Sequence, residues 1–175
     1  MSKHDDIEHL SEHVETALQQ ARFAEAMTLL NASGADIPAL NLLRARALYG
    51  LERFGAAMNE VAELLEGKIE EPLRLRARAV RQRLMGVMSR TEDALTNAID
   101  LARDAERAGA LDEAVEANTE AAWLYGRMRC RPLAEARIAR ARALAEKARE
   151  QRKPEDETLA REIDLIEAFV LVQFD

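Results

Sequence analysis

The chain has 175 residues and a formal net charge of −7, and aromatic residues make up only 4% of it. Seven glycines and four prolines are few for this length, which favours helices and argues against an all-β core. The acidic balance argues against a dedicated nucleic-acid binder. A single cysteine excludes an intrachain disulfide and fits a reducing cytoplasm, and no apolar run reaches the roughly 20 residues that would span a membrane. We therefore expect a cytoplasmic all-α protein.

Helical periodicity divides the chain into nine segments. In the first, Ile7, Leu10, Val14 and Leu18 recur at spacings that place them on one helical face. The pattern predicts helices at about 6–20, 23–32, 38–51, 55–65, 72–88, 91–109, 111–128, 133–151 and 155–173. The breaks between them are short, so we expect one helical domain over residues 1–175.

Glycine and proline mark several of the predicted helix ends. Gly34 and Gly67 follow the second and fourth helices, where a residue without a side chain ends a helix at low cost. Pro38, Pro72 and Pro132 open the third, fifth and eighth helices, because the first helical turn does not need the N–H that proline lacks. These signals agree with the boundaries that periodicity predicts.

A short motif recurs within this pattern, in the stretches 21–30, 51–65 and 108–117. Each copy begins with or follows a small residue, then has a large apolar anchor and an alanine three residues after the anchor; the small residues are Ala21, Gly50 and Gly109. The anchors and alanines are Phe23 with Ala26, Phe54 with Ala57, and Leu111 with Ala114. Residues three apart share a helix face, so the anchor can fill a groove while the alanine lets two helices approach. Such recurrence is typical of a solenoid of helix pairs.

The motif and its flanking residues resemble the tetratricopeptide repeat, a helix–turn–helix unit of about 34 residues. The residues that carry the resemblance are Ala45, Ala47, Leu48, Phe54 and Ala57 in one unit, and Ala98, Leu101, Ala102, Ala105, Gly109, Leu111, Ala114 and Ala121 in another. The resemblance implies antiparallel helix pairs stacked as a right-handed solenoid. Its units are expected near 6–33, 38–66 and 91–128, followed by helices at 132–151 and 155–173. The helix at 72–88 either pairs with the next helix or is an odd helix in the stack.

What the resemblance implies is binding rather than chemistry. Proteins of this family mostly act as scaffolds or adaptors that hold a peptide or a helix in a concave groove. The sequence itself offers no Gly-rich phosphate loop and no serine in a nucleophile elbow, so we expect no enzyme, no catalytic residue and no cofactor. The alternative is a helical regulatory or sensor domain of a larger system that binds a small molecule or a peptide.

Charge is segregated along the chain. Seven Lys/Arg oppose two acids in 68–90, and ten oppose three in 127–153, whereas 91–120 and 154–175 are acidic. Bands of opposite sign either face each other in the stack or are solvated, which is the simpler interpretation. The functional interpretation is a groove for an acidic peptide, with Arg74, Arg78 and Arg81 as its cations. Nucleic acid is disfavoured, because no stacking aromatics alternate with these arginines.

Two aromatic residues are candidate anchors for the same groove. Trp123 and Tyr125 lie close together on the seventh predicted helix. Packing in the core is the simpler interpretation, since large aromatics dominate core burial. A role in binding is the alternative, because Trp and Tyr are frequent hot-spot residues.

Two further features could support chemistry. His9, Glu12 and His13 match the H-x-x-E-H pattern of one metalloprotease class, but the pattern is short and lacks a further ligand, so we expect no metal site. Cys130 lies between Arg129 and Arg131, where positive charge could activate a thiol, but an inert turn cysteine is the simpler interpretation.

The last predicted helix carries apolar residues on more than one side. Leu159, Ile163, Ile166 and Val170 form one stripe, and Leu165, Phe169 and Val172 form a second. A helix that closes a solenoid should present a polar outer face. Three outcomes follow: the helix packs into its own stack, pairs with a second copy, or meets a partner. Self-association through this helix is the outcome that we favour.

Overall fold

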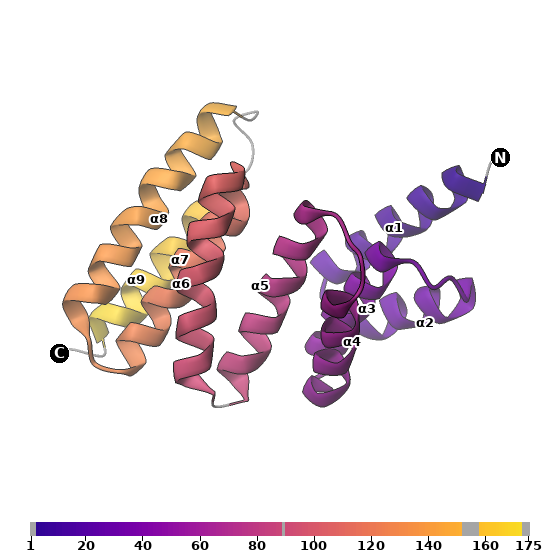
Figure 1. Ribbon diagram of the computed structural model, residues 1–175, viewed down its shortest axis with the longest axis horizontal. Helices are drawn as coiled ribbons and strands as arrows, with labels where there is room; N and C mark the ends of the chain where they lie inside the picture. The colour runs from indigo at the N-terminus through magenta and orange to yellow at the C-terminus, as the bar shows by residue number, and fades with distance from the viewer. Residues whose placement is uncertain (1–2, 89, 152–157, 173–175) are drawn as a thin grey trace. The chain divides into compact units, whose positions relative to one another are not determined.

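The computed structural model describes residues 3–88, 90–151 and 158–172 (Figure 1). These residues form nine helices and no strand, which confirms the all-α prediction, and every described end lies within three residues of its predicted place. The helices are α1 Lys3–Gln19, α2 Phe23–Ser33, α3 Pro38–Gly50, α4 Phe54–Glu66, α5 Glu71–Val87, α6 Thr91–Ala108, α7 Leu111–Arg127, α8 Arg131–Gln151 and α9 Thr158–Val172.

The chain divides into two compact units, Met1–Leu84 and Met85–Asp175, with the division inside α5. We call them the N-terminal and C-terminal units and describe each by itself. That all 175 residues form one domain stays a prediction.

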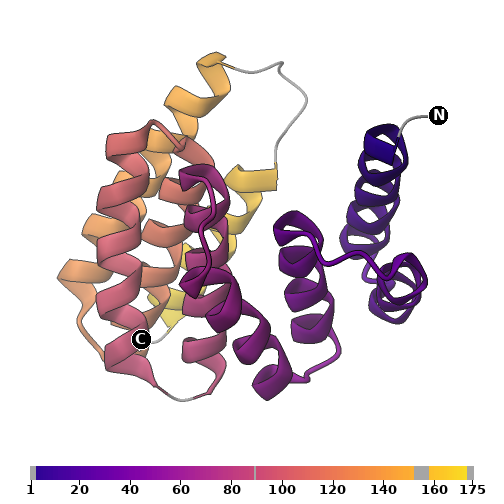
Figure 2. The ribbon, with the colours of Figure 1, turned by 45° about the vertical axis from the view of Figure 1, so that its right-hand side comes forward.

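The N-terminal unit is built around α3. Helices α1, α2 and α3 contact one another, and α4 packs on α3 (Figure 2). On one side of α3, Leu40 and Leu43 join a cluster with α1 and α2. On the other side, Leu42 and Leu48 join a cluster with α4 and α5. Burial on both sides explains why α3 is apolar around most of its surface.

The motif residues lie where close helix packing needs them. Ala26, Ala57 and Ala114 are all fully buried. The ring of Phe23 occupies the space where a side chain at Gly50 would stand, so a Cβ there would clash with it. The anchor-and-alanine pattern therefore marks close helix contacts, as its spacing predicts.

One tight turn recurs between successive helices. Ala21, Glu52 and Arg129 adopt the left-handed conformation, with φ of 55°, 59° and 57°, and Gly109 does so with φ of 71°. In each turn the next residue's N–H donates to the carbonyl five residues back, as Arg22 does to Ala17 at 2.8 Å. This hydrogen bond satisfies a carbonyl that the helix end would otherwise leave unpaired.

The C-terminal unit is built around α7. Helix α7 contacts α6, α8 and α9 (Figure 1), and ten of its seventeen residues are buried. Five of those ten are alanine or glycine: Ala114, Ala117, Ala121, Ala122 and Gly126. Small residues on a central helix let its neighbours come close on several sides. This packing holds α6 and α8 beside α7, where the candidate site lies.

Candidate functional site

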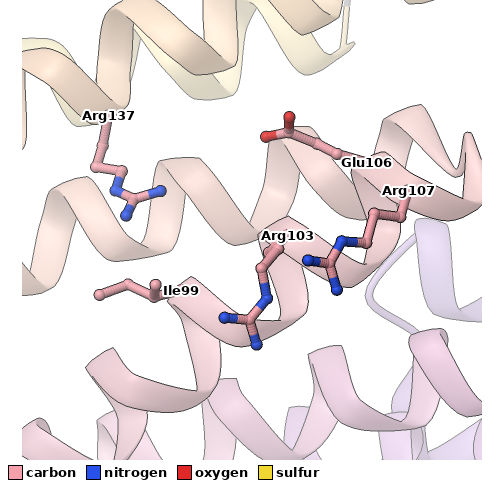
Figure 3. Close-up of a pocket in the computed structure, with 5 residues that line it drawn as sticks. All are labelled: Ile99, Arg103, Glu106, Arg107 and Arg137. Atoms are coloured by element: carbon pink, nitrogen blue, oxygen red, sulfur yellow. The ribbon is translucent and has the colours of Figure 1, made fainter.

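The site is an open pocket of about 560 Å³ on the surface of the C-terminal unit. Figure 3 shows its lining: Arg103 and Arg107 extend from α6 beside each other, and Arg137 comes from α8. Glu106 and the apolar side chain of Ile99 complete the wall. Three arginines and one apolar residue, from two helices, therefore line the same pocket.

A buried amide holds Arg137 in place. Asn118 on α7 has no exposed surface, and its Oδ1 accepts a hydrogen bond from Arg137 Nη1 at 3.1 Å. Asn118 Nδ2 donates to the carbonyl of Ala114 at 2.9 Å and approaches Glu106 Oε1 at 3.5 Å. A buried amide is costly unless its polar atoms are hydrogen-bonded. Here the bonds that satisfy it also fix the position of an arginine at the pocket.

Glu106 is tied to a second arginine of α8. Arg140 donates from Nε to Glu106 Oε1 at 3.2 Å and from Nη2 to Oε2. The hydrogen bond from Arg140 lowers the pKa of Glu106, and the charge of Arg140, the bond from Asn118 and the charge of Arg137 add to this effect, while burial opposes it. The same bond raises the pKa of Arg140. Glu106 is therefore ionised at neutral pH and its charge is matched by Arg140.

The arginines of α6 also have carboxylate partners. Arg103 Nη2 donates to Asp100 at 2.7 Å, and its Nε lies 3.7 Å from Asp104. Arg107 Nη1 lies 3.9 Å from Asp104. Arg137 differs: among the described residues no carboxylate lies within 4.0 Å of it, and its one hydrogen bond goes to the neutral Asn118. Among the described residues Arg137 is thus the one arginine of the pocket without an ion pair, and the acid that its charge acts on, Glu106, is already paired with Arg140.

The three arginines predicted from the sequence lie on α5, in the N-terminal unit. Arg74 donates to the carbonyl oxygens of Leu65 at 3.2 Å and Gly67 at 3.4 Å, where it stabilises the end of α4. Arg78 and Arg81 are half-buried. Burial, followed by the charge of Arg78, lowers the pKa of Arg81.

The two predicted aromatic residues lie on α7, in the C-terminal unit, and both are half-buried. The ring of Trp123 lies 6.3 Å from that of Phe169 on α9, and Arg127 stacks over it at 4.8 Å. Trp123 therefore takes part in helix packing and also holds a surface arginine. Because the arginines and the aromatics belong to different units, the groove that they would form together stays a prediction.

The sequence did not single out Glu106, Asn118, Arg137 or Arg140. The usable signal was Asn118, one polar residue on the alanine-rich face of α7 formed by Ala114, Ala117 and Ala121. An amide on such a face needs partners, but helical spacing alone does not reveal which residues of other helices supply them.

The histidine motif makes only local contacts. His13 Nδ1 lies 2.8 Å from the carbonyl of His9, and Glu12 lies 4.0 Å from His9 Nδ1. Nowhere in the described ranges do three His, Cys, Asp or Glu side chains gather as a metal site would require.

Cys130 is half-buried, with Sγ 3.6 Å from the carbonyl of Met128. A membrane span is also not found in the searched helices, since none is both long and apolar enough.

Resemblance to known proteins does not assign this chain to a family. Comparisons with family models, with curated proteins and with solved structures found no match. The tetratricopeptide resemblance therefore stays a prediction from the motif residues, and the function has to be argued from the pocket.

Proposed function

We propose that this chain is a protein-interaction scaffold or adaptor that binds an acidic segment of a partner at the pocket between α6 and α8. The observation that carries the proposal is Arg137, a cation held by a buried neutral amide with no carboxylate of the described chain within 4.0 Å. We assign the chain no catalytic residue and no cofactor.

The recurring turn supports the repeat architecture within this proposal. Four described turns have a left-handed residue and a hydrogen bond across five residues, between α1 and α2, α3 and α4, α6 and α7, and α7 and α8. Helix pairs joined by one kind of turn are what a tetratricopeptide-like right-handed solenoid needs. We propose that arrangement for the chain.

The chemistry of the pocket defines the segment that it would bind. Arg137 uses one N–H for Asn118, and a guanidinium group has five, so a bidentate bond to a carboxylate is still available to it. Ile99 offers an apolar contact within the same pocket. We therefore expect the best ligand to carry Asp or Glu next to an apolar residue. The pocket is open, which favours an extended segment over an enclosed small molecule.

The rim charges would affect the rate of binding more than its strength. Arg103 and Arg107 share Asp100 and Asp104, so their positive charge is largely offset at short range. Exposed charges of this kind steer an approaching partner and are screened by salt. Arg137 should instead affect the dissociation rate, because it makes the specific bond.

A peptide array tests the proposal. The array holds degenerate peptides with a central Glu-Leu or Asp-Leu, matched to peptides with Gln-Leu or Asn-Leu, and the purified full chain is the probe. We expect the acidic peptides to retain the chain and the amide peptides to lose most of the signal, because the amides cannot form the charge-assisted bond. Equal retention by both sets would contradict the proposal, and so would retention by neither.

A further inference from the structure

Helix α9 is held in the C-terminal unit by one of its faces. Ile163 and Val170 are buried there, and α9 contacts both α7 and α8. Gly126 on α7 permits the close approach, since a Cβ at that position would lie 3.2 Å from Val170 Cγ2. Arg142 on α8 donates to Asp164 at 2.9 Å and also to Glu167. These contacts fix which side of α9 points away from the unit.

An apolar stripe runs along the outward side of α9. Leu165 is 72% exposed and Val172 is 71% exposed, and Ala168 between them is also exposed. Their spacings of three and four residues place them in a row on one side of the helix, opposite Ile163 and Val170. Two large apolar side chains exposed to this degree on the same stripe form an apolar surface that is available to another element.

The order of residues in this stripe is self-complementary. If a second α9 lies antiparallel across the first, a two-fold axis near residue 168 places Leu165 of each copy against Val172 of the other. The same axis places Ala168 against Ala168 of the second copy, so the smallest residue lies where the two helices cross. A symmetric contact requires one surface patch to fit itself, and this large–small–large row does so. We propose that the chain forms a homodimer through antiparallel pairing of the outward faces of α9.

The charges near the stripe are compatible with this pairing. Asp164 and Glu167 are the described acids on this part of α9, and Arg142 of the same chain bonds both of them, which offsets one of their two negative charges. The paired stripe is short, however, whereas a stable interface buries roughly 800 Å² per partner. The dimer should therefore be weak and should depend on concentration.

Disulfide trapping tests the register. In a full-length Cys130→Ser background, Ala168→Cys should form a covalent dimer rapidly under mild oxidation, because the two-fold axis brings this residue against its own copy. Ala143→Cys is the control, since Ala143 is an exposed alanine on the neighbouring helix α8. Leu165→Cys alone should crosslink slowly. The double variant Leu165→Cys/Val172→Cys should crosslink about as fast as Ala168→Cys. Equal rates for residues 168 and 143 would overturn the proposal.

Sedimentation equilibrium provides an independent measurement. The wild-type chain should show a mass that rises with concentration toward the dimer. Leu165→Glu should weaken association at least about tenfold, because each copy would bury an unpaired carboxylate. Ala143→Glu adds the same charge outside the stripe and should leave association unchanged. A strictly monomeric wild type, or a dimer that Leu165→Glu does not weaken, would overturn the proposal.

Discussion

At the scale of single residues, Asn118 determines the properties of the pocket. It is a neutral acceptor, so it fixes the position of Arg137 without neutralising it. The same side chain bonds the backbone of α7 and lies near Glu106, which joins α6, α7 and α8 through one amide. A buried polar group of this kind is costly unless every atom is satisfied. Because Asn118 also fixes the position of Arg137, a substitution there should affect binding.

Asn118→Asp should weaken binding of a Glu-Leu peptide at least about tenfold, because the new carboxylate would form an ion pair with Arg137 and compete with the ligand. Fluorescence anisotropy with a labelled peptide measures the affinity. Thr119→Ser, a neighbouring buried polar position on α7, serves as the control and should leave the affinity unchanged. An Asn118→Asp variant that folds and binds like the wild type would contradict the role of Asn118.

Glu106 should make the free energy of unfolding depend on pH. Its pKa is lowered in the folded state, mainly by the hydrogen bond from Arg140. A lowered folded-state pKa contributes stability above the unfolded pKa of about 4.3, and that contribution is lost as the pH falls through the folded value. The stability difference between wild type and Glu106→Gln should therefore be complete at neutral pH and shrink below about pH 4.3. Urea denaturation at several pH values measures it, and a constant difference would contradict the assignment.

At the scale of helices, most of the fold could be predicted from the sequence. Apolar periodicity, Pro38 and Gly67 defined helix ends because these are local properties of the chain. The turns were harder to predict, since Ala21, Glu52 and Arg129 adopt a left-handed conformation that glycine usually takes. The anchor-and-alanine motif also did not identify Ala94 in α6. This alanine is fully buried, but it has no large apolar residue three positions before it.

The buried alanines of the motif should not tolerate larger side chains. Ala57→Leu or Ala114→Leu should lower the free energy of unfolding by about 1–3 kcal/mol, because leucine adds an isopropyl group at a fully buried alanine. The control is Ala56→Leu, at the exposed neighbour of Ala57 on α4. Equilibrium denaturation measures all three variants, and two neutral substitutions at the buried positions would argue against the close packing.

At the scale of the whole molecule, charge segregation has a structural explanation in the C-terminal unit. The basic segment 127–153 contacts both acidic segments there, through Arg140 to Glu106 and through Arg142 to Asp164 and Glu167. From the sequence, bands of opposite sign could either pair or be solvated, and in this unit they pair. It could not predict that Arg137 would bond an amide instead, because that depends on which side of α8 packs against α7.

A double-mutant cycle tests the central claim, that Arg137 binds a carboxylate of the partner. The cycle combines Arg137→Gln with a Glu→Gln change in a Glu-Leu peptide that the array selects, and isothermal titration calorimetry measures the four affinities. We predict a coupling of at least about 1.4 kcal/mol, a tenfold effect, for Arg137. The same cycle with Arg149→Gln, an exposed arginine of the same helix, should give about zero. Equal coupling at both arginines, or none at Arg137, would contradict the proposed site.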